Sequence, residues 1–265
     1  MFADSLLRLT HSCFFVLAKC RPSSLLLLVM VVVFSFLFHT IINSFGEGPH
    51  YVEIKLAFPP EAEIDGTDDP SKNIILLEMA PAEEMPHAVY WFLRQVDLGL
   101  YDGCSFHRNA GHVIQGGPAP NFLSPHDPRL SRRFQQSGFD SIPFQEYSPN
   151  FPHKQYTVGY AGRPGGPDFY ISIQDNTEAH GPGGQTDYAD VEEADPCFAR
   201  VVEGFEVVNK MKESPIEPGD YNHMVYNIAI VSMRILDQNS HEDEAPDGDD
   251  QTGGGGNEDQ QRRYR

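Results

Sequence analysis

The sequence is poor in positive charge. Its 265 residues contain 19 lysines and arginines against 38 aspartates and glutamates, which gives a formal net charge of −19. Nucleic acids and anionic lipid surfaces are polyanions, so this balance argues against nonspecific binding to either. The sequence also contains no Asn-x-Ser/Thr acceptor, so we do not expect N-glycosylation. These absences exclude classes of ligand but leave the fold open.

Long apolar runs are absent beyond the N-terminal part of the chain. There, residues 25–42 are apolar except for Ser35, His39 and Thr40, and this length is about what a helix needs to cross a bilayer. Basic residues precede the run and acidic residues follow it, so its N-terminal side should lie in the cytosol. We predict an uncleaved signal-anchor helix and a single-pass membrane protein. The alternative is a signal peptide that is cleaved to release a secreted protein.

These patterns predict five parts. Residues 1–24 form a cytosolic N-terminal segment, 25–42 the transmembrane signal-anchor helix and 43–50 a linker. Residues 51–236 form one folded domain, and 237–265 form an acidic tail. The tail has almost no aliphatic side chains and cannot bury enough apolar surface to offset its ordering entropy, so we expect it to be disordered. The folded domain is expected in the lumen of the secretory pathway, either the endoplasmic reticulum or the Golgi.

Cysteine is scarce, with four residues in the chain. Cys104 and Cys197 belong to the part that we place in an oxidising compartment, where two lone thiols can pair. Nothing in the sequence brings them within bonding distance. A disulfide and two free thiols therefore both stay open.

The apolar residues between 51 and 236 recur mostly with a period of two, which is typical of β-strands. Two segments have helical spacing instead, 86–98 and 205–211. The strands are predicted at 51–58, 73–79, 105–108, 112–115, 156–161, 169–173, 198–202 and 226–236. This order predicts a mainly β fold, a closed eight-stranded antiparallel barrel capped by two helices. Closing the barrel leaves no exposed edge strand.

Two short motifs carry most of the chemical information. Residues 101–108 read YDGCSFHR, and residues 115–117 read QGG after a tight glycine-bearing segment. The first strand ends in Arg108, and the second delivers Gln115. The two side chains can then point the same way from neighbouring strands, whereas alternation points His107 to the opposite face.

These motifs resemble the signature of cyclophilins, the barrel-shaped peptidyl-prolyl cis-trans isomerases, in which a YDG-x-x-FHR run precedes a QGGD run. Two further passages are similar to the family and occur in the family's order. Residues 141–146 (SIPFQE) look like the loop before its fifth strand, and residues 198–208 (FARVVEGFEVV) are similar to the passage into its last helix. The resemblance covers about 51–236 and implies the cyclophilin barrel and its activity.

The implied reaction needs neither a nucleophile nor a cofactor. Rotation about an X–Pro bond faces a barrier of roughly 20 kcal/mol because the amide loses resonance on twisting. An enzyme lowers it by binding the twisted state better than the planar one. The resemblance implies that Arg108, whose guanidinium stays charged, donates to the proline nitrogen, and that Gln115 binds a substrate carbonyl or orients Arg108.

The resemblance places the substrate pocket at seven positions, most of which have a different residue type from the family's. They are His112, Val113, Gly159, Tyr160, Ala161, Asp168 and Tyr170. His112 and Val113 stand where the family has a Phe-Met pair. Tyr170 keeps the ring of a family phenylalanine and adds a hydroxyl group. Asp168 replaces a glutamine and Tyr160 an asparagine, so the pocket should be more polar and more anionic than the family's.

An insertion at residues 175–185 replaces the tryptophan-bearing stretch that the family has after this pocket. We expect weaker binding of proline peptides as a result, with basic flanking residues favoured over acidic ones. The insertion contains Asp175, Glu178 and His180, and Asp187 follows it. Their spacing fits no recognised metal template, so we predict neither a metal nor a cofactor.

The sequence leaves two functions open. The first is a monomeric, membrane-anchored peptidyl-prolyl isomerase that acts on proline-containing polypeptides and assists protein folding in the lumen. The second is a catalytically weak or inactive module of the same fold that binds proline-containing segments. The altered pocket is the reason for the second.

Overall fold

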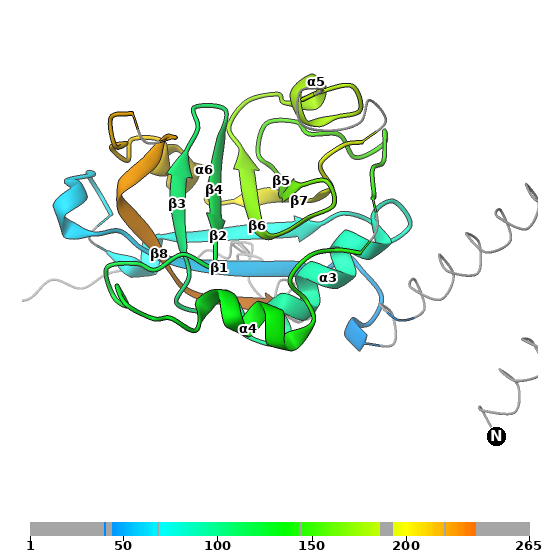
Figure 1. Cartoon of the computed structure of the whole chain (residues 1–265), viewed down its shortest axis with the longest axis horizontal. Coiled ribbons are helices and arrows are strands. Elements are labelled where there is room, and N and C mark those ends of the chain that lie inside the picture. Colours follow the sequence, from blue (N-terminus) through cyan, green and yellow to red (C-terminus); the bar gives the residue numbers. More distant parts are fainter. Residues whose placement is uncertain are drawn as a thin grey trace, which may run out of the picture.

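The computed structural model describes residues 40, 44–67, 69–143, 145–185, 193–219 and 221–236. Eight antiparallel strands close into one barrel in the order β1-β2-β7-β5-β6-β4-β3-β8 (Figure 1). This confirms the predicted closed eight-stranded barrel. Every strand in the closed order has two neighbours, so its backbone hydrogen bonds are satisfied within the barrel.

The strands are β1 (Tyr51–Ala57), β2 (Ile74–Met79), β3 (Ser105–Asn109), β4 (Val113–Gly117), β5 (Thr157–Gly162), β6 (Gly165–Ser172), β7 (Cys197–Glu203) and β8 (His223–Leu236). The helices are α3 (Pro86–Asp97), α4 (Leu130–Ser137), α5 (Thr177–His180) and α6 (Phe205–Met211), with short 3-10 turns η1 (Pro60–Ala62) and η2 (Pro70–Lys72). Helices α3 and α6 are the two predicted ones. The prediction missed α4 and the single turn α5.

Helix α4 escaped prediction because its buried face is very narrow. Only Leu130 and Phe134 are buried in it, one turn apart, and its other residues are polar. Two apolar residues at this spacing are too few to establish a helical period. Figure 1 shows α4 and α3 on one side of the barrel and α5 on the other.

No helix in the part of the chain that the structure describes is long and apolar enough to cross a membrane. The predicted cytosolic segment 1–24, the predicted tail 237–265 and, apart from Thr40, the predicted transmembrane helix 25–42 lie outside the described residues.

Aromatic side chains fill the barrel. Phe92 of α3 packs against Phe198 of β7, with ring centroids 4.6 Å apart, and against Phe169 of β6 at 5.7 Å. Tyr101 lies edge-on to Phe169 at 5.1 Å. Offset and edge-to-face rings at these distances stabilise a core beyond the area that they bury. These contacts fix the side chains on the inner face of β6. The side chains on its outer face do not belong to this core.

The N-terminus of α3 is capped from a distant part of the sequence. Glu146, in the connection between α4 and β5, accepts hydrogen bonds from the backbone N–H groups of His87 (2.9 Å) and Ala88 (2.7 Å). Helices leave their first N–H groups unsatisfied, and a carboxylate there also complements the helix dipole. The contact holds Glu146 and the end of its loop against α3.

Candidate functional site

Arg108 and Gln115 lie opposite each other on adjacent strands, as the motifs predicted. They are register partners in the antiparallel pair β3–β4. The Arg108 Nη1 group donates to the Gln115 Oε1 atom at 3.0 Å, and its Nε group donates to the backbone carbonyl of Tyr221 at 3.0 Å. These two bonds fix the guanidinium plane. Its Nη2 group has no partner among the described residues and is available to a ligand.

The row of polar side chains continues from β4 to β6. Gln115 donates from Nε2 to the Asp168 Oδ2 atom at 2.9 Å. An amide that gives its N–H to a carboxylate must present its oxygen at the other end, so Asp168 aims the Gln115 oxygen at Arg108. Asp168 is thus a positioning residue for the pair.

His107 also belongs to this row, which contradicts the prediction from strand alternation. A β-bulge between Phe106 and Arg108 breaks the alternation, and the His107 Nε2 atom lies 4.0 Å from the Asp168 carboxylate. Burial lowers the pKa of His107, and the charge of Asp168 offsets part of that effect. A bulge adds one residue to a strand and re-aims the side chains around it.

The two glycines of the QGG motif are required by close packing on both faces of β4. A Cβ atom on Gly116 would lie 2.9 Å from the Phe106 ring, on the inner face. A Cβ atom on Gly117 would lie 1.8 Å from the Asp168 carboxylate, on the outer face. Only glycine leaves room for Asp168 to reach Gln115.

Tyr170 follows Asp168 by two residues and pairs in register with Gln115, so it lies on the same outer face of the sheet. It is nevertheless buried, because His180 of α5 covers it. The centroid of the His180 ring lies 4.8 Å from that of Tyr170 and 5.4 Å from that of His112. An imidazole of the chain itself therefore occupies the space between two predicted walls of the proline pocket.

We call His180, together with the insertion 175–185 that carries it, the cover, and the face around Tyr170 beneath it the covered face. A buried carboxylate holds the cover in place. Asp195 accepts hydrogen bonds from the Arg163 Nε group (2.8 Å), the His180 Nδ1 group (2.5 Å) and the Tyr170 hydroxyl (3.0 Å). Burial opposes ionisation of Asp195, but the bonds from His180 and Arg163 outweigh it and lower the pKa of the carboxyl. Burial raises the pKa of Tyr170. Breaking one partner of such a buried pair costs about 3–5 kcal/mol.

Hydrogen bonds to backbone carbonyl groups anchor the insertion at both ends. The Asn176 side chain donates to the His112 carbonyl at 3.0 Å, and the Asn176 backbone donates to the His153 carbonyl at 2.8 Å. Arg163 donates from Nη1 to the carbonyl of Gly184 at 2.7 Å. The insertion is therefore a structured part of the domain, and its His180 lies over Tyr170 of β6 and beside His112.

The other predicted pocket residues divide between this covered face and the barrel interior. His112 and Ala161 are half-buried, and Val113 is buried at the start of β4. A Cβ atom on Gly159 would lie 2.9 Å from the Tyr170 hydroxyl oxygen, so glycine there makes room for that hydroxyl.

Tyr160 does not share this face. Its ring lies in the core, 4.5 Å from that of Phe198, and its hydroxyl donates to the Gln95 side chain at 2.6 Å. Its side chain therefore points into the barrel, and the predicted contact of this side chain with substrate does not fit its position. The resemblance was applied to all of residues 159–161 together. It did not distinguish the side chain that points into the barrel from those that point outward.

Three residues of the covered face were absent from the predicted site residues. Arg163, Asp195 and His153 are brought together from three separate parts of the chain and have no common spacing. Local sequence patterns report neighbours on one element, so no signal of that kind marks this cluster.

Metal-binding groups and a disulfide are both absent from the part of the chain that the structure describes. No group of three His, Cys, Asp or Glu side chains there is arranged to hold a metal ion, and Asp187 lies outside that part. Cys104 and Cys197 are both free and buried. Burial raises the pKa of each thiol to about 12, so both stay protonated.

The family model "Cyclophilin type peptidyl-prolyl cis-trans isomerase/CLD" matches residues 69–235, which is more than half of the chain. The chain belongs to the cyclophilin-type peptidyl-prolyl isomerase family. The isomerase domain contains both motifs and the complete site described above.

Two solved structures are similar to this cyclophilin-type chain. One is a cyclophilin type peptidyl-prolyl cis-trans isomerase of Cryptosporidium parvum, 16% identical with a TM-score of 0.48, over 71% of this chain and 98% of that chain. The other is the same protein in the presence of the dipeptide ala-pro, 17% identical with a TM-score of 0.48, over 71% and 99% of the two chains. A search of curated proteins finds no match.

The covered face predicts a specific acid sensitivity of this cyclophilin-type domain. Burial lowers the pKa of His153 from 6.5 to about 4. Between these values the unfolded chain binds a proton that the folded chain does not, so folding stability falls as the pH falls, by at most about 1.4 kcal/mol per pH unit. Urea unfolding of the full chain in detergent between pH 4.5 and 7 measures the slope. His153→Gln should flatten it and His126→Gln, at an exposed position, should not; equal slopes in all three proteins contradict the assignment.

Proposed function

We propose that this cyclophilin-type domain isomerises X–Pro bonds with Arg108 as the hydrogen-bond donor to the proline nitrogen. The observation that carries the proposal is the held guanidinium, which Tyr221 and Gln115 fix in place while its Nη2 group stays available. A donor that needs no rearrangement when the nitrogen becomes pyramidal stabilises the twisted state more than the planar one.

Gln115 and Asp168 act through Arg108 in this mechanism. Asp168 fixes the Gln115 amide, and the amide oxygen fixes the Arg108 fork. A carboxylate two contacts from the guanidinium also makes the approach to the site anionic. We therefore propose proline-containing polypeptides with basic flanking residues as substrates, and a monomer as the acting species.

Arg108→Ala tests the proposed donor. We expect the catalysed isomerisation rate of a proline-containing peptide to fall about 100-fold, which is typical when one preorganised donor is removed. Arg108→Lys should restore little, since an ammonium group does not reproduce the fork. The matched control is Arg129→Ala, which removes an exposed arginine paired with Asp127. Full activity in Arg108→Ala would remove Arg108 from the mechanism.

A second function is favoured by the cover over Tyr170. With His180 seated between His112 and Tyr170, a proline ring must displace the imidazole before it can enter the hollow. Displacement also breaks the bond between His180 and the buried Asp195. If this cost is not recovered, the domain binds proline-containing segments at Arg108 and Gln115 without useful turnover, which is the weak or inactive module.

His180→Ala separates these two functions. Removing the imidazole leaves the Arg163–Asp195 pair in place and opens the space beside Tyr170. We expect kcat/KM for a proline peptide to rise about tenfold, which corresponds to about 1.4 kcal/mol of released cost. Circular dichroism checks that the variant is folded, and His126→Ala is the exposed control. A folded His180→Ala protein with unchanged kcat/KM shows that the imidazole does not limit entry.

We propose that residues 25–42 anchor the protein in a membrane of the secretory pathway and that the isomerase domain faces the lumen. The charge difference across the apolar run supports this orientation. Release of a secreted form by cleavage is the alternative.

Protease protection in sealed microsomes measures the orientation. The domain should resist added protease until detergent opens the vesicles, and the protein should stay in the membrane pellet after an alkaline wash. Digestion without detergent contradicts the lumenal placement. Loss from the pellet together with a shortened N-terminus identifies the cleaved form.

A further inference from the structure

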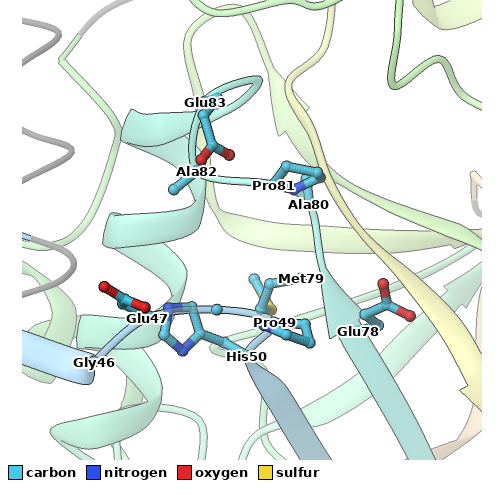
Figure 2. A pocket seen from close by; sticks show the side chains of 11 residues that line it. Gly46, Glu47, Pro49, His50, Glu78, Met79, Ala80, Pro81, Ala82 and Glu83 are labelled. Atoms are coloured by element: carbon cyan, nitrogen blue, oxygen red, sulfur yellow. The ribbon is translucent and has the colours of Figure 1, made fainter.

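A cavity of about 520 Å³ lies where β2 ends and the chain enters β1 (Figure 2). It is lined by residues 46–50 and 78–83. In the closed barrel β8 separates β1 from β3 on one side, and β7, β5 and β6 separate β2 from β4 on the other. The cavity is therefore a different site from the one around Arg108, and its volume is in the range of small-ligand pockets.

Much of the cavity wall is apolar. Met79, Pro49 and Pro81 contribute hydrocarbon surface, and Figure 2 shows them around the hollow. Met79 is fixed by the bond from its backbone N–H to the His50 carbonyl at 2.9 Å. A wall of this kind suits the aliphatic part of a ligand, because methylene groups gain free energy when they leave water.

Carboxylates frame the cavity from three sides. Figure 2 shows Glu47, Glu78 and Glu83 around the hollow. Glu78 is already paired with Arg200, through bonds of 2.8 and 2.9 Å from Nη2 to its two carboxylate oxygens. Glu83 has no hydrogen-bond or ion-pair partner among the described residues. Glu83 therefore leaves an uncompensated negative charge at the rim, which attracts a cation.

His50 supplies an independent sign of a ligand. It is 7% exposed, its ring lies in the cavity wall and stands edge-on to Phe45, with centroids 6.4 Å apart. Neither ring nitrogen has a hydrogen-bond partner among the described residues. Burial lowers the pKa of His50, so the ring is neutral near pH 7 and offers one nitrogen as an acceptor. A ring nitrogen that faces a cavity without a protein partner is open to a ligand.

We propose that this cavity binds an arginine side chain presented by a separate polypeptide. The aliphatic stem packs on Met79 and the two prolines, the guanidinium meets Glu83, and one of its N–H groups donates to His50. Arginine fits better than lysine because its planar fork can meet a carboxylate and an imidazole at once. The proposal goes beyond the isomerase site and does not depend on it.

A separate polypeptide is favoured over the chain's own C-terminal arginines on grounds of charge. Arg262, Arg263 and Arg265 follow a segment, 237–259, that contains nine aspartates and glutamates. Bringing that segment to a rim of three glutamates sets like charges against each other. A basic partner meets no such opposition and is attracted by the whole chain, whose net charge is −19.

Calorimetric titration of the full chain in detergent with acetyl-Ala-Arg-Ala-amide tests the site. We expect binding that weakens at least tenfold when citrulline, the neutral isostere, replaces the arginine, and at least tenfold in Glu83→Gln. The exposed Glu206→Gln variant is the matched control and should bind normally. Equal binding of the two peptides, or unchanged binding in Glu83→Gln, overturns the proposal. Chemical-shift changes at the Met79 methyl group place the peptide in the cavity; changes elsewhere only would overturn the location.

Two further variants separate the sources and the sites. Replacing Arg262, Arg263 and Arg265 by glutamine should leave the peptide affinity unchanged. A higher affinity in that variant identifies the tail as a competing occupant and overturns the assignment to a separate partner. Arg108→Ala should reduce isomerisation and leave this titration unchanged, so failure at one site does not count as failure at the other.

Discussion

The outer face of this cyclophilin-type barrel depends on one buried carboxylate. Asp195, in the segment before β7, accepts hydrogen bonds from three side chains. Arg163 comes from the turn between β5 and β6, His180 from the insertion and Tyr170 from β6, so one carboxylate connects these segments. A buried carboxylate is tolerated only where several donors compensate its lost hydration. Because each donor also belongs to the covered face, the ion cluster and the closed hollow form together.

The site consists of two parts with opposite properties. Arg108, Gln115 and Asp168 form a partly exposed polar row that is set for a ligand. Beside it, the aromatic surface of Tyr170, which would receive the proline ring, is covered by His180. The donor that we propose, Arg108, is held in place, and the space beside Tyr170 is filled. This combination is the reason that an isomerase and a weak binding module are both proposed.

The sequence was sufficient for features that repeat along one element. The period of two gave the eight strands, and the FHR and QGG runs placed Arg108 opposite Gln115. It failed where geometry depends on distant segments: the bulge that turns His107 toward Asp168, the inward direction of Tyr160, and the position of His180 over Tyr170. Each of these is fixed by contacts between residues far apart in the chain, so no local pattern reports them.

Magnitudes show how evenly balanced the covered hollow is. A proline ring brings three methylene groups, worth roughly 2.4 kcal/mol if fully buried. Moving His180 away removes a charge-assisted hydrogen bond to Asp195, which is worth about 1.5–3 kcal/mol. These terms nearly cancel, so the ring alone provides little affinity. The proposal therefore requires that the residues on either side of the proline supply most of the binding, and that the charge of Asp168 selects among them.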